Sequence, residues 1–131
     1  GFVWYSGNRA AYIGRLDPAN GEITRYPMPD PVARDPHTLV FDENADIWFT
    51  VQGGNFVGKL GTRTGAIQLI PVPTERARPY GIKVDADNRP WFVELGTNKL
   101  ASVNPETGSL IQTISMHKIW ISSAPDRSSN S

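Results

Sequence analysis

The sequence contains no cysteine. This absence excludes disulfide bonds, thiolate metal sites and a cysteine nucleophile, and it leaves the cellular compartment open. The chain also lacks a net charge, because 13 lysines and arginines balance 13 aspartates and glutamates. A balanced charge argues against bulk electrostatic attraction to nucleic acid or to an anionic membrane. We therefore expect neither nucleic acid nor a membrane among the partners.

Long apolar runs and long helical patterns are missing as well. No run approaches the length of a membrane span, and no window keeps the i, i+3, i+4, i+7 apolar spacing of an amphipathic helix. No secretory signal is visible, but the chain begins in mid-repeat at Gly1, which leaves room for an upstream leader. We expect a soluble protein, with an extracytoplasmic location favoured.

What the chain does contain is an internal repeat. The stretch DIWFT at 46–50 recurs as PWFVE at 90–94 and as VWYS at 3–6, with tryptophans at positions 4, 48 and 91. Two further markers keep the same step: residues 13–21 return at 57–65 and 100–108, and residues 36–42 return at 79–85. Three markers that share one period indicate tandem structural units.

Each unit predicts short strands joined by turns. Frequent glycine and proline, 12 and 11 residues, suit such a fold. The expected strands are 2–6, 11–16 and 22–27, followed by a proline-rich loop at 28–36; then 37–42, 46–52, 56–61 and 66–72; then 80–85, 90–95, 99–104 and 109–115. Four antiparallel strands in about 43 residues match one blade of a β-propeller. The predicted fold class is therefore all-β, a β-propeller with about three blades, at 1–36, 37–79 and 80–116.

Apolar residues that recur in register predict the faces buried between blades. The pairs are Trp48/Trp91, Phe49/Phe92, Leu39/Ile82, Phe41/Val84, Val57/Leu100 and Ile67/Leu110. Each such side chain contributes roughly 1.5–3 kcal/mol when fully buried. Propellers usually have about 4–8 blades. We therefore expect either a fragment of a longer ring or a protomer that completes a ring by self-association through exposed blade faces.

The last residues, 117–131, differ from the repeat. Residues 117–122 (HKIWIS) either form a frayed terminus or supply the innermost strand that the first unit lacks. Residues 124–131 are polar and serine-rich, so we expect disorder there.

Polar residues gather where a propeller places its channel mouth. The loop before each innermost strand and the loop after the next strand emerge at the same end, and convergent polar groups there predict a ligand-binding site. The residues in these loops are Arg34, Asp35, His37, Gln52 and Asn55, then Arg76, Arg78, Tyr80, Glu94, Thr97 and Asn98. Of these, His37, Arg78, Tyr80, Gln52 and Asn98 are the predicted binding residues, and Glu94 is the candidate catalytic residue.

Several of these residues have a structural interpretation beside the functional one. His37 is either a hydrogen-bonded loop residue or a ligand-binding group or base. Glu94 is either an acceptor for neighbouring amides or a general base or metal-linked acid. Arg76 and Arg78 either hold an acidic substrate or are solvated loop charges. The sequence shows no nucleophile–base pair, phosphate loop or cluster of metal ligands, and so no evident cofactor.

Four motifs carry a family resemblance. IWFT at 47–50, PYGI at 79–82, IGRLDP at 13–18 and NPETG at 104–108 resemble the streptogramin B lyase (virginiamycin B lyase) family, over residues 2–115. The resemblance implies a seven-bladed propeller. It also implies a lyase that opens a cyclic depsipeptide antibiotic at its ester by elimination, with Mg²⁺ near the site.

The resemblance further implies which residues act. The family has a histidine just past the Trp-Phe-Thr strand of one blade and a Glu-x-His in the next. Glu94 stands at the glutamate position, but Gly53 and Gly96 stand at the two histidine positions. Either the catalytic blades lie outside this segment, or the chain is a non-catalytic propeller that binds a small molecule, a cyclic peptide or a protein.

Overall fold

The computed structural model describes residues 1–115, which form strands joined by turns and loops. The strands are β1 (Val3–Ser6), β2 (Tyr12–Asp17), β3 (Glu22–Pro27), β4 (Pro36–Phe41), β5 (Ile47–Val51), β6 (Phe56–Leu60), β7 (Ile67–Pro71), β8 (Pro79–Val84), β9 (Pro90–Glu94), β10 (Lys99–Val103) and β11 (Leu110–Ser115). The described part of the chain contains no helix long and apolar enough to cross a membrane.

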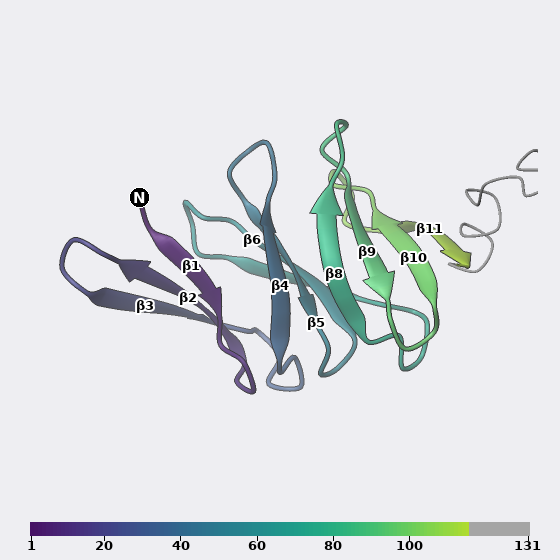
Figure 1. The fold of residues 1–131 in the computed structure, drawn as a ribbon, viewed down its shortest axis with the longest axis horizontal. Coiled ribbons are helices and arrows are strands. Elements are labelled where there is room, and N and C mark those ends of the chain that lie inside the picture. Colours follow the sequence, from purple (N-terminus) through teal and green to yellow (C-terminus); the bar gives the residue numbers. More distant parts are fainter. Residues whose placement is uncertain (116–131) are drawn as a thin grey trace, which may run out of the picture.

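The strands form three antiparallel sheets that fan out side by side (Figure 1). Their orders are β1-β2-β3, β4-β5-β6-β7 and β8-β9-β10-β11. The sheets are the blades of a β-propeller, so the predicted fold class is confirmed. The strand predictions agree to within two residues. One correction is that Pro36 begins β4 instead of ending the loop before it. The predictions for 117–131 lie outside the described residues.

The first strands of the second and third sheets, β4 and β8, lie next to each other where the sheets meet (Figure 1). Both contain a register irregularity at the same place, between Pro36 and Leu39 in β4 and between Pro79 and Ile82 in β8. A β-bulge re-aims the side chains of the bulged strand. The two innermost strands therefore present the residues after these prolines in the same way.

The hydrophobic core lies between adjacent sheets. Ile13, Phe49 and Val51 belong to a buried cluster between the first and second sheets, and Trp48 and Phe92 belong to a second cluster between the second and third. Successive strand residues face opposite sides of a sheet, which explains why neighbouring Trp48 and Phe49 enter different clusters. Each sheet is therefore stabilised mainly by its neighbours.

Phe41 is an exception to the predicted core. Its side chain is 53% exposed, although the repeat pairs it with Val84, which packs against the second cluster. Val84 lies on β8, beside the innermost strand β4 of the preceding blade. The first sheet has no such innermost strand among the described residues, so nothing equivalent covers Phe41. The prediction that Phe41 is buried was therefore wrong.

The turn at the far end of each complete blade is closed by an aspartate and a tryptophan. The Asp42 carboxylate accepts hydrogen bonds from the amides of Asn44 and Asp46, at 2.9 and 3.0 Å, and from the Trp48 indole, at 3.0 Å. Asp85 repeats the pattern, accepting from the amides of Asp87 and Arg89 and from the Trp91 indole, at 2.9, 3.0 and 2.8 Å. Both aspartates therefore close their turns through amide and indole hydrogen bonds.

A buried hydroxyl connects the second blade to the third. Thr50 is fully buried; its Oγ1 donates to the Tyr80 carbonyl oxygen at 2.5 Å and accepts from the Thr38 amide at 3.2 Å. Ser6 occupies the equivalent position of the first sheet and donates to the His37 carbonyl oxygen at 3.4 Å. The same bond thus fixes each innermost strand to the preceding blade.

We expect Thr50→Val to lower the free energy of unfolding by about 1–3 kcal/mol, because it keeps the shape but leaves the Tyr80 carbonyl and the Thr38 amide without their partner. Thr50→Ser, which retains the hydroxyl, should lose clearly less. Urea unfolding of the three proteins measures the difference. Equal losses in both variants would show that the methyl group, and not the hydroxyl, matters.

We also expect the Asp85 turn to respond to acid. The Trp91 indole and the Arg89 and Asp87 amides hold the pKa of Asp85 below its ordinary value. A carboxyl with a depressed folded pKa contributes stability above its unfolded pKa, about 3.9, and loses it as the pH falls through the folded value. The stability difference between wild type and Asp85→Asn should therefore be constant near neutrality and shrink in acid. Unfolding at several pH values tests this; a stability difference that stays constant into acid would contradict it.

Candidate functional site

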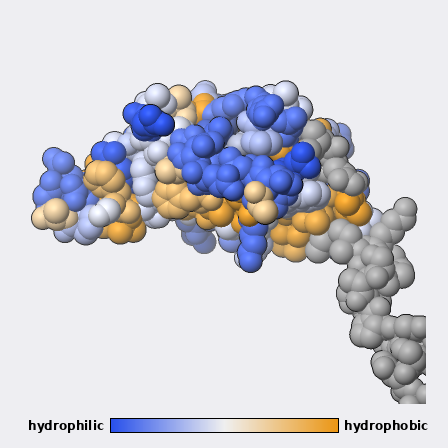
Figure 2. All heavy atoms as spheres, turned by 90° about the horizontal axis from the view of Figure 1, so that it is seen from above, coloured by the Kyte–Doolittle hydropathy of each residue, from blue (hydrophilic) through white to orange (hydrophobic). Residues whose placement is uncertain are grey.

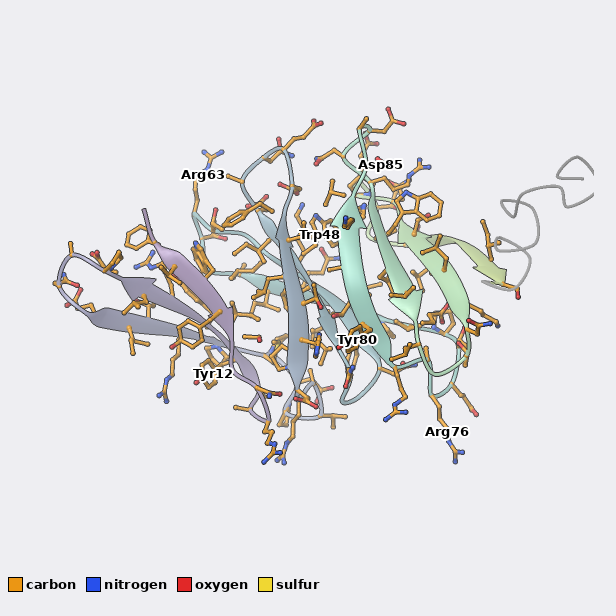
Figure 3. All side chains as sticks on the ribbon, viewed as in Figure 1. Tyr12, Trp48, Arg63, Arg76, Tyr80 and Asp85 are labelled. Carbon is orange, nitrogen blue, oxygen red and sulfur yellow. The ribbon has the colours of Figure 1, made fainter. Side chains whose placement is uncertain are left out.

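The loops that hold the predicted site residues meet at one end of the sheets, opposite the Asp85 turn (Figure 3). The Gln52 amide donates to the Asp35 carbonyl oxygen at 3.3 Å. In the next blade the Leu95 amide donates to the Arg78 carbonyl oxygen at 3.2 Å. The loop after the second strand of each complete blade is therefore hydrogen-bonded to the loop that enters the same blade. We call this end the mouth.

His37 and Tyr80 are the two predicted residues that lie in direct contact. Their ring centroids are 4.0 Å apart, with the ring planes inclined by 33°. Each follows the proline that begins an innermost strand, at the bulge described above. The His37 Nδ1 atom lies 2.9 Å from the Thr38 Oγ1 atom. Both rings are exposed, Tyr80 to 40%, so the pair forms an accessible aromatic surface at the mouth.

Glu94 lies at the mouth end of β9 and is only 1% exposed. Strand alternation places it on the same face as Phe92, toward the second sheet. Neither carboxylate oxygen has a hydrogen-bond partner among the described residues. The buried Asn55 Oδ1 and Thr97 Oγ1 atoms, in the loops of the same end, lack partners too. Burying a carboxylate without a partner is costly, so fold stability does not account for a glutamate at this position.

The described residues contain no group of three or more histidine, aspartate or glutamate side chains that could hold a metal ion. Among the mouth residues that the structure describes, Glu94 is the one buried carboxylate. Any cation there would share one carboxylate with neutral oxygen atoms and water, which is a coordination that Mg²⁺ accepts.

The two glycines at the mouth are required by close backbone contacts. The Gly53 amide donates to the Arg34 carbonyl oxygen at 2.9 Å, and a Cβ atom at position 53 would lie 2.6 Å from that oxygen. The Gly96 amide donates to the Ala77 carbonyl oxygen at 2.8 Å, and a Cβ atom there would collide with the Arg76 carbonyl oxygen. Neither position has room for a histidine in this loop conformation.

The arginines of the mouth take different positions. The Arg78 side chain covers Gly96, since its Cγ and Cδ atoms lie 3.0 Å from where a Cβ atom on that glycine would be. Arg34 turns back on its own loop and donates from Nε to the Pro31 carbonyl oxygen at 3.3 Å. Arg76 points away from the sheets into solvent (Figure 3). The structure therefore brings Arg78 into the mouth and leaves Arg76 outside it.

Several mouth residues adopt the left-handed backbone region, which is unusual for residues other than glycine. The φ angles are 64° for Asp35, 67° for Asn55, 52° for Arg76, 49° for Arg78 and 55° for Asn98. Such strained conformations cluster at ligand-binding loops when the surrounding structure holds them. Asn98 is exposed and Gln52 is half-buried; their amide groups make no contact with the His37–Tyr80 pair that the structure records.

Charge is distributed unequally between the two ends of the sheets. The turns of the far end carry mostly carboxylates, and hydrophilic residues cover much of that end (Figure 2). The carboxylates of the far end are Asp17, Glu22, Asp42, Glu43, Asp46, Asp85, Asp87 and Glu106. The basic residues there include Arg63, Arg89 and Lys59, whose Nζ atom lies 3.9 Å from a carboxylate oxygen of Asp46. The mouth loops carry Arg9, Arg34, Arg76, Arg78 and Lys99 beside Asp30, Asp35, Glu75 and Glu94. The field therefore favours a polar or anionic ligand at the mouth over the far end.

Sequence reasoning missed the groups that hold the mouth in place. Thr50 and Ser6 were read only as strand residues, although both occupy the same repeat position and donate to the residue after an innermost-strand proline. The repeat register contained this signal, because a hydroxyl side chain recurs there with the expected spacing. The indole bonds to Asp42 and Asp85 were likewise not predicted.

Comparison with known proteins supports the same family. Staphylococcus aureus virginiamycin B lyase is 28% identical and superposes with a TM-score of 0.78, over 87% of this chain and 37% of that chain. A streptogramin B lyase structure is 31% identical, with a TM-score of 0.76 over 85% of this chain and 36% of its own length. A catalytically inactive histidine-to-alanine variant of the S. aureus enzyme, with quinupristin, is 28% identical, with a TM-score of 0.79 over 88% and 38% of the two chains.

The chain thus spans little more than a third of these relatives. Among curated proteins, none matches it. The sequence profile of the virginiamycin B lyase family, however, matches residues 1–118. With three propeller blades and the motifs of that profile over nearly its whole length, the chain belongs to the virginiamycin B lyase family.

Proposed function

We propose that this protein opens a cyclic depsipeptide at its ester bond by elimination, with Glu94 as the residue of these blades that takes part in the chemistry. The observation that carries the proposal is the state of Glu94: a carboxylate at the mouth, 1% exposed, with both oxygens unpartnered. Such groups are typical of functional sites, where a side chain is kept for its chemistry and not for stability. The family membership supplies the reaction class.

The reaction requires few groups. A base removes the proton α to a carbonyl, the electron pair forms a carbon–carbon double bond, and the adjacent C–O bond of the ester breaks so that a carboxylate leaves. The product is a linear isomer of the substrate, whereas hydrolysis would add one water molecule. A buried carboxylate such as Glu94 suits such a site as a general base, or as the group that orients the base.

Glu94 also has the donor atoms of a Mg²⁺ ligand. Mg²⁺ is commonly bound by one or two carboxylates and several waters, and the unpartnered oxygens of Glu94, Thr97 and Asn55 are of the right donor type. A bound Mg²⁺ would stabilise negative charge that develops on a substrate oxygen. Glu94 would hold it, while the mouth loops would limit access of bulk water.

A second candidate function is a ligand-binding propeller without catalysis. The tight backbone contacts of Gly53 and Gly96 favour it, because they leave no room for a histidine at either position. The related S. aureus enzyme is catalytically inactive as a histidine-to-alanine variant, so a histidine matters in that protein. Among the residues described here, the imidazole at the mouth is that of His37.

Glu94→Gln distinguishes the two functions. If the protein is a lyase, incubation with a type B streptogramin and Mg²⁺ should yield the linear isomer, and the substitution should lower turnover by about 10²–10⁴. The fold should not be weakened, because glutamine removes a buried charge that has no partner. Liquid chromatography with mass detection measures the product, and urea unfolding measures stability. Full ring-opening activity in Glu94→Gln would exclude Glu94 from the chemistry. An absence of ring opening in the wild type, while the antibiotic still binds, would favour the non-catalytic function.

The glycine contacts make a separate prediction. Gly96→Ala should lower the free energy of unfolding by about 1–3 kcal/mol, because the added methyl group must displace the backbone of the entering loop. Gly81→Ala is the matched control, since its Cβ atom would meet only the Val93 side chain, at an ordinary 3.4 Å. Thermal or urea unfolding of both variants provides the comparison. A loss as large in Gly81→Ala would mean that glycine itself, and not the contact at 96, is required.

A further inference from the structure

We propose that the first sheet of a second copy of this chain packs on the open face of the third sheet, head to tail. The first sheet (β1–β3) and the third sheet (β8–β11) lie at opposite ends of the fan (Figure 1), and each has one face that no described sheet covers. The proposal concerns assembly and goes beyond the proposed function, because it rests on the repeat and not on the chemistry of the mouth.

The open face of the third sheet is apolar. Phe92 and Ala101 belong to the cluster between the second and third sheets. Because successive strand residues face opposite sides of a sheet, Trp91, Val93 and Leu100 face away from the second sheet. These three side chains line a hollow of about 490 Å³ on that face. An apolar hollow on an open sheet face is typical of an interaction site.

The open face of the first sheet has the pattern by which sheets pack on each other elsewhere in this chain. The residues by which the third sheet packs on the second include Phe92, Val103 and Leu110. The residues at the same register positions of the first sheet are Tyr5, Leu16 and Ile23. All three are aromatic or aliphatic, and the Ile23 side chain is 56% exposed. The first sheet therefore leaves open the face that the third sheet buries.

Tyr5 is held in the same way as its buried counterpart, Phe49. A Cβ atom on Gly14 would collide with the Tyr5 ring, and a Cβ atom on Gly58 would collide with the Phe49 ring. Each ring therefore lies over a glycine of the next strand. The Tyr12 ring also meets the Tyr5 ring edge-on, with centroids 6.4 Å apart. Phe49 is fully buried because the first sheet covers it, so Tyr5 is already positioned for an equivalent cover.

The third sheet lacks the groups that hold a following innermost strand. Ser6 and Thr50 each donate a hydrogen bond to a carbonyl oxygen of the next innermost strand, but Val93 stands at the equivalent position and has no donor. Val40 packs against the cluster beside β8, but the exposed Lys83 stands at its equivalent position. Burying an unpaired lysine is costly. The third sheet thus suits a neighbour without an innermost strand, and among the described sheets the first is of that kind.

Two copies joined in this way form a closed ring. Each copy has three described sheets, so two copies bring six sheets together, which lies within the range of about 4–8 blades for propellers. A head-to-tail contact closes when its rotation returns to the first subunit, and here the contact occurs twice. Every described sheet then has a neighbour on both faces, and the mouth loops of both copies surround one channel.

The mass of the full chain in solution tests the contact. Sedimentation velocity over a wide range of protein concentration should show a dimer, with twice the mass of the 14.4 kDa chain. Val93→Glu on the third sheet and Ile23→Glu on the first should each abolish the dimer, because each places a charge in the apolar contact. Val32→Glu is the matched control, since Val32 is 60% exposed in the loop between β3 and β4, outside both faces, and it should leave the dimer intact.

A mixture of the two variants tests the head-to-tail direction. Val93→Glu keeps an intact first sheet and Ile23→Glu keeps an intact third sheet, so the mixture should form a heterodimer although each variant alone is monomeric. This result also shows that both variants are folded, which far-ultraviolet circular dichroism checks for each one separately. A wild-type chain that is monomeric at every concentration would overturn the proposal. A dimer that Ile23→Glu retains would show that two third sheets pack on each other and would overturn it too, as would variants with native circular dichroism that stay monomeric when mixed.

Discussion

The packing of one sheet face on the next is the constraint on which the whole structure depends. Each sheet buries little within itself, and its large side chains enter the clusters between sheets. Trp48 and Phe49 serve opposite interfaces from adjacent positions, so a single strand links two cores. The sheets must therefore lie at a fixed angle to each other, and the loops at their ends inherit that geometry. The geometry of the mouth therefore depends on the packing at the interfaces between the sheets.

Hydrogen bonds fix the relative position of the sheets, which apolar packing alone does not determine. Apolar contacts are not directional and allow one sheet to slide on another. The Thr50 hydroxyl is directional: it accepts a hydrogen bond from the Thr38 amide and donates one to the Tyr80 carbonyl oxygen. That bond fixes the start of β8 relative to the second blade. The position of Tyr80 beside His37 is thus set by a group on a different strand, which explains how a stacked pair can persist at an exposed loop end.

The repeat made the blades and the loops of the mouth predictable, because period, turn residues and tryptophan positions all agree. The exposure of Phe41 was not predictable from the repeat, because equivalent positions differ in their neighbours: Val84 lies beside β4, and no described innermost strand covers Phe41. The conformation of the loops that contain Gly53 and Gly96 was also not predictable from the sequence. Gly53 and Gly96 were recognised as departures from the family pattern, but only coordinates show that the neighbouring backbone occupies the space.

Glu94 and the two glycines, Gly53 and Gly96, have opposite effects on stability at the mouth. The glycine loops are packed backbone against backbone and leave no space for a side chain, whereas Glu94 is enclosed without any partner for its charge. The tight backbone packing of the glycine loops stabilises the fold, whereas a buried carboxylate without a partner is costly. Stability therefore does not explain Glu94, which agrees with its proposed role in the chemistry of the mouth. With glycine at both positions, a catalytic base must be Glu94 itself or a residue from another part of the mouth.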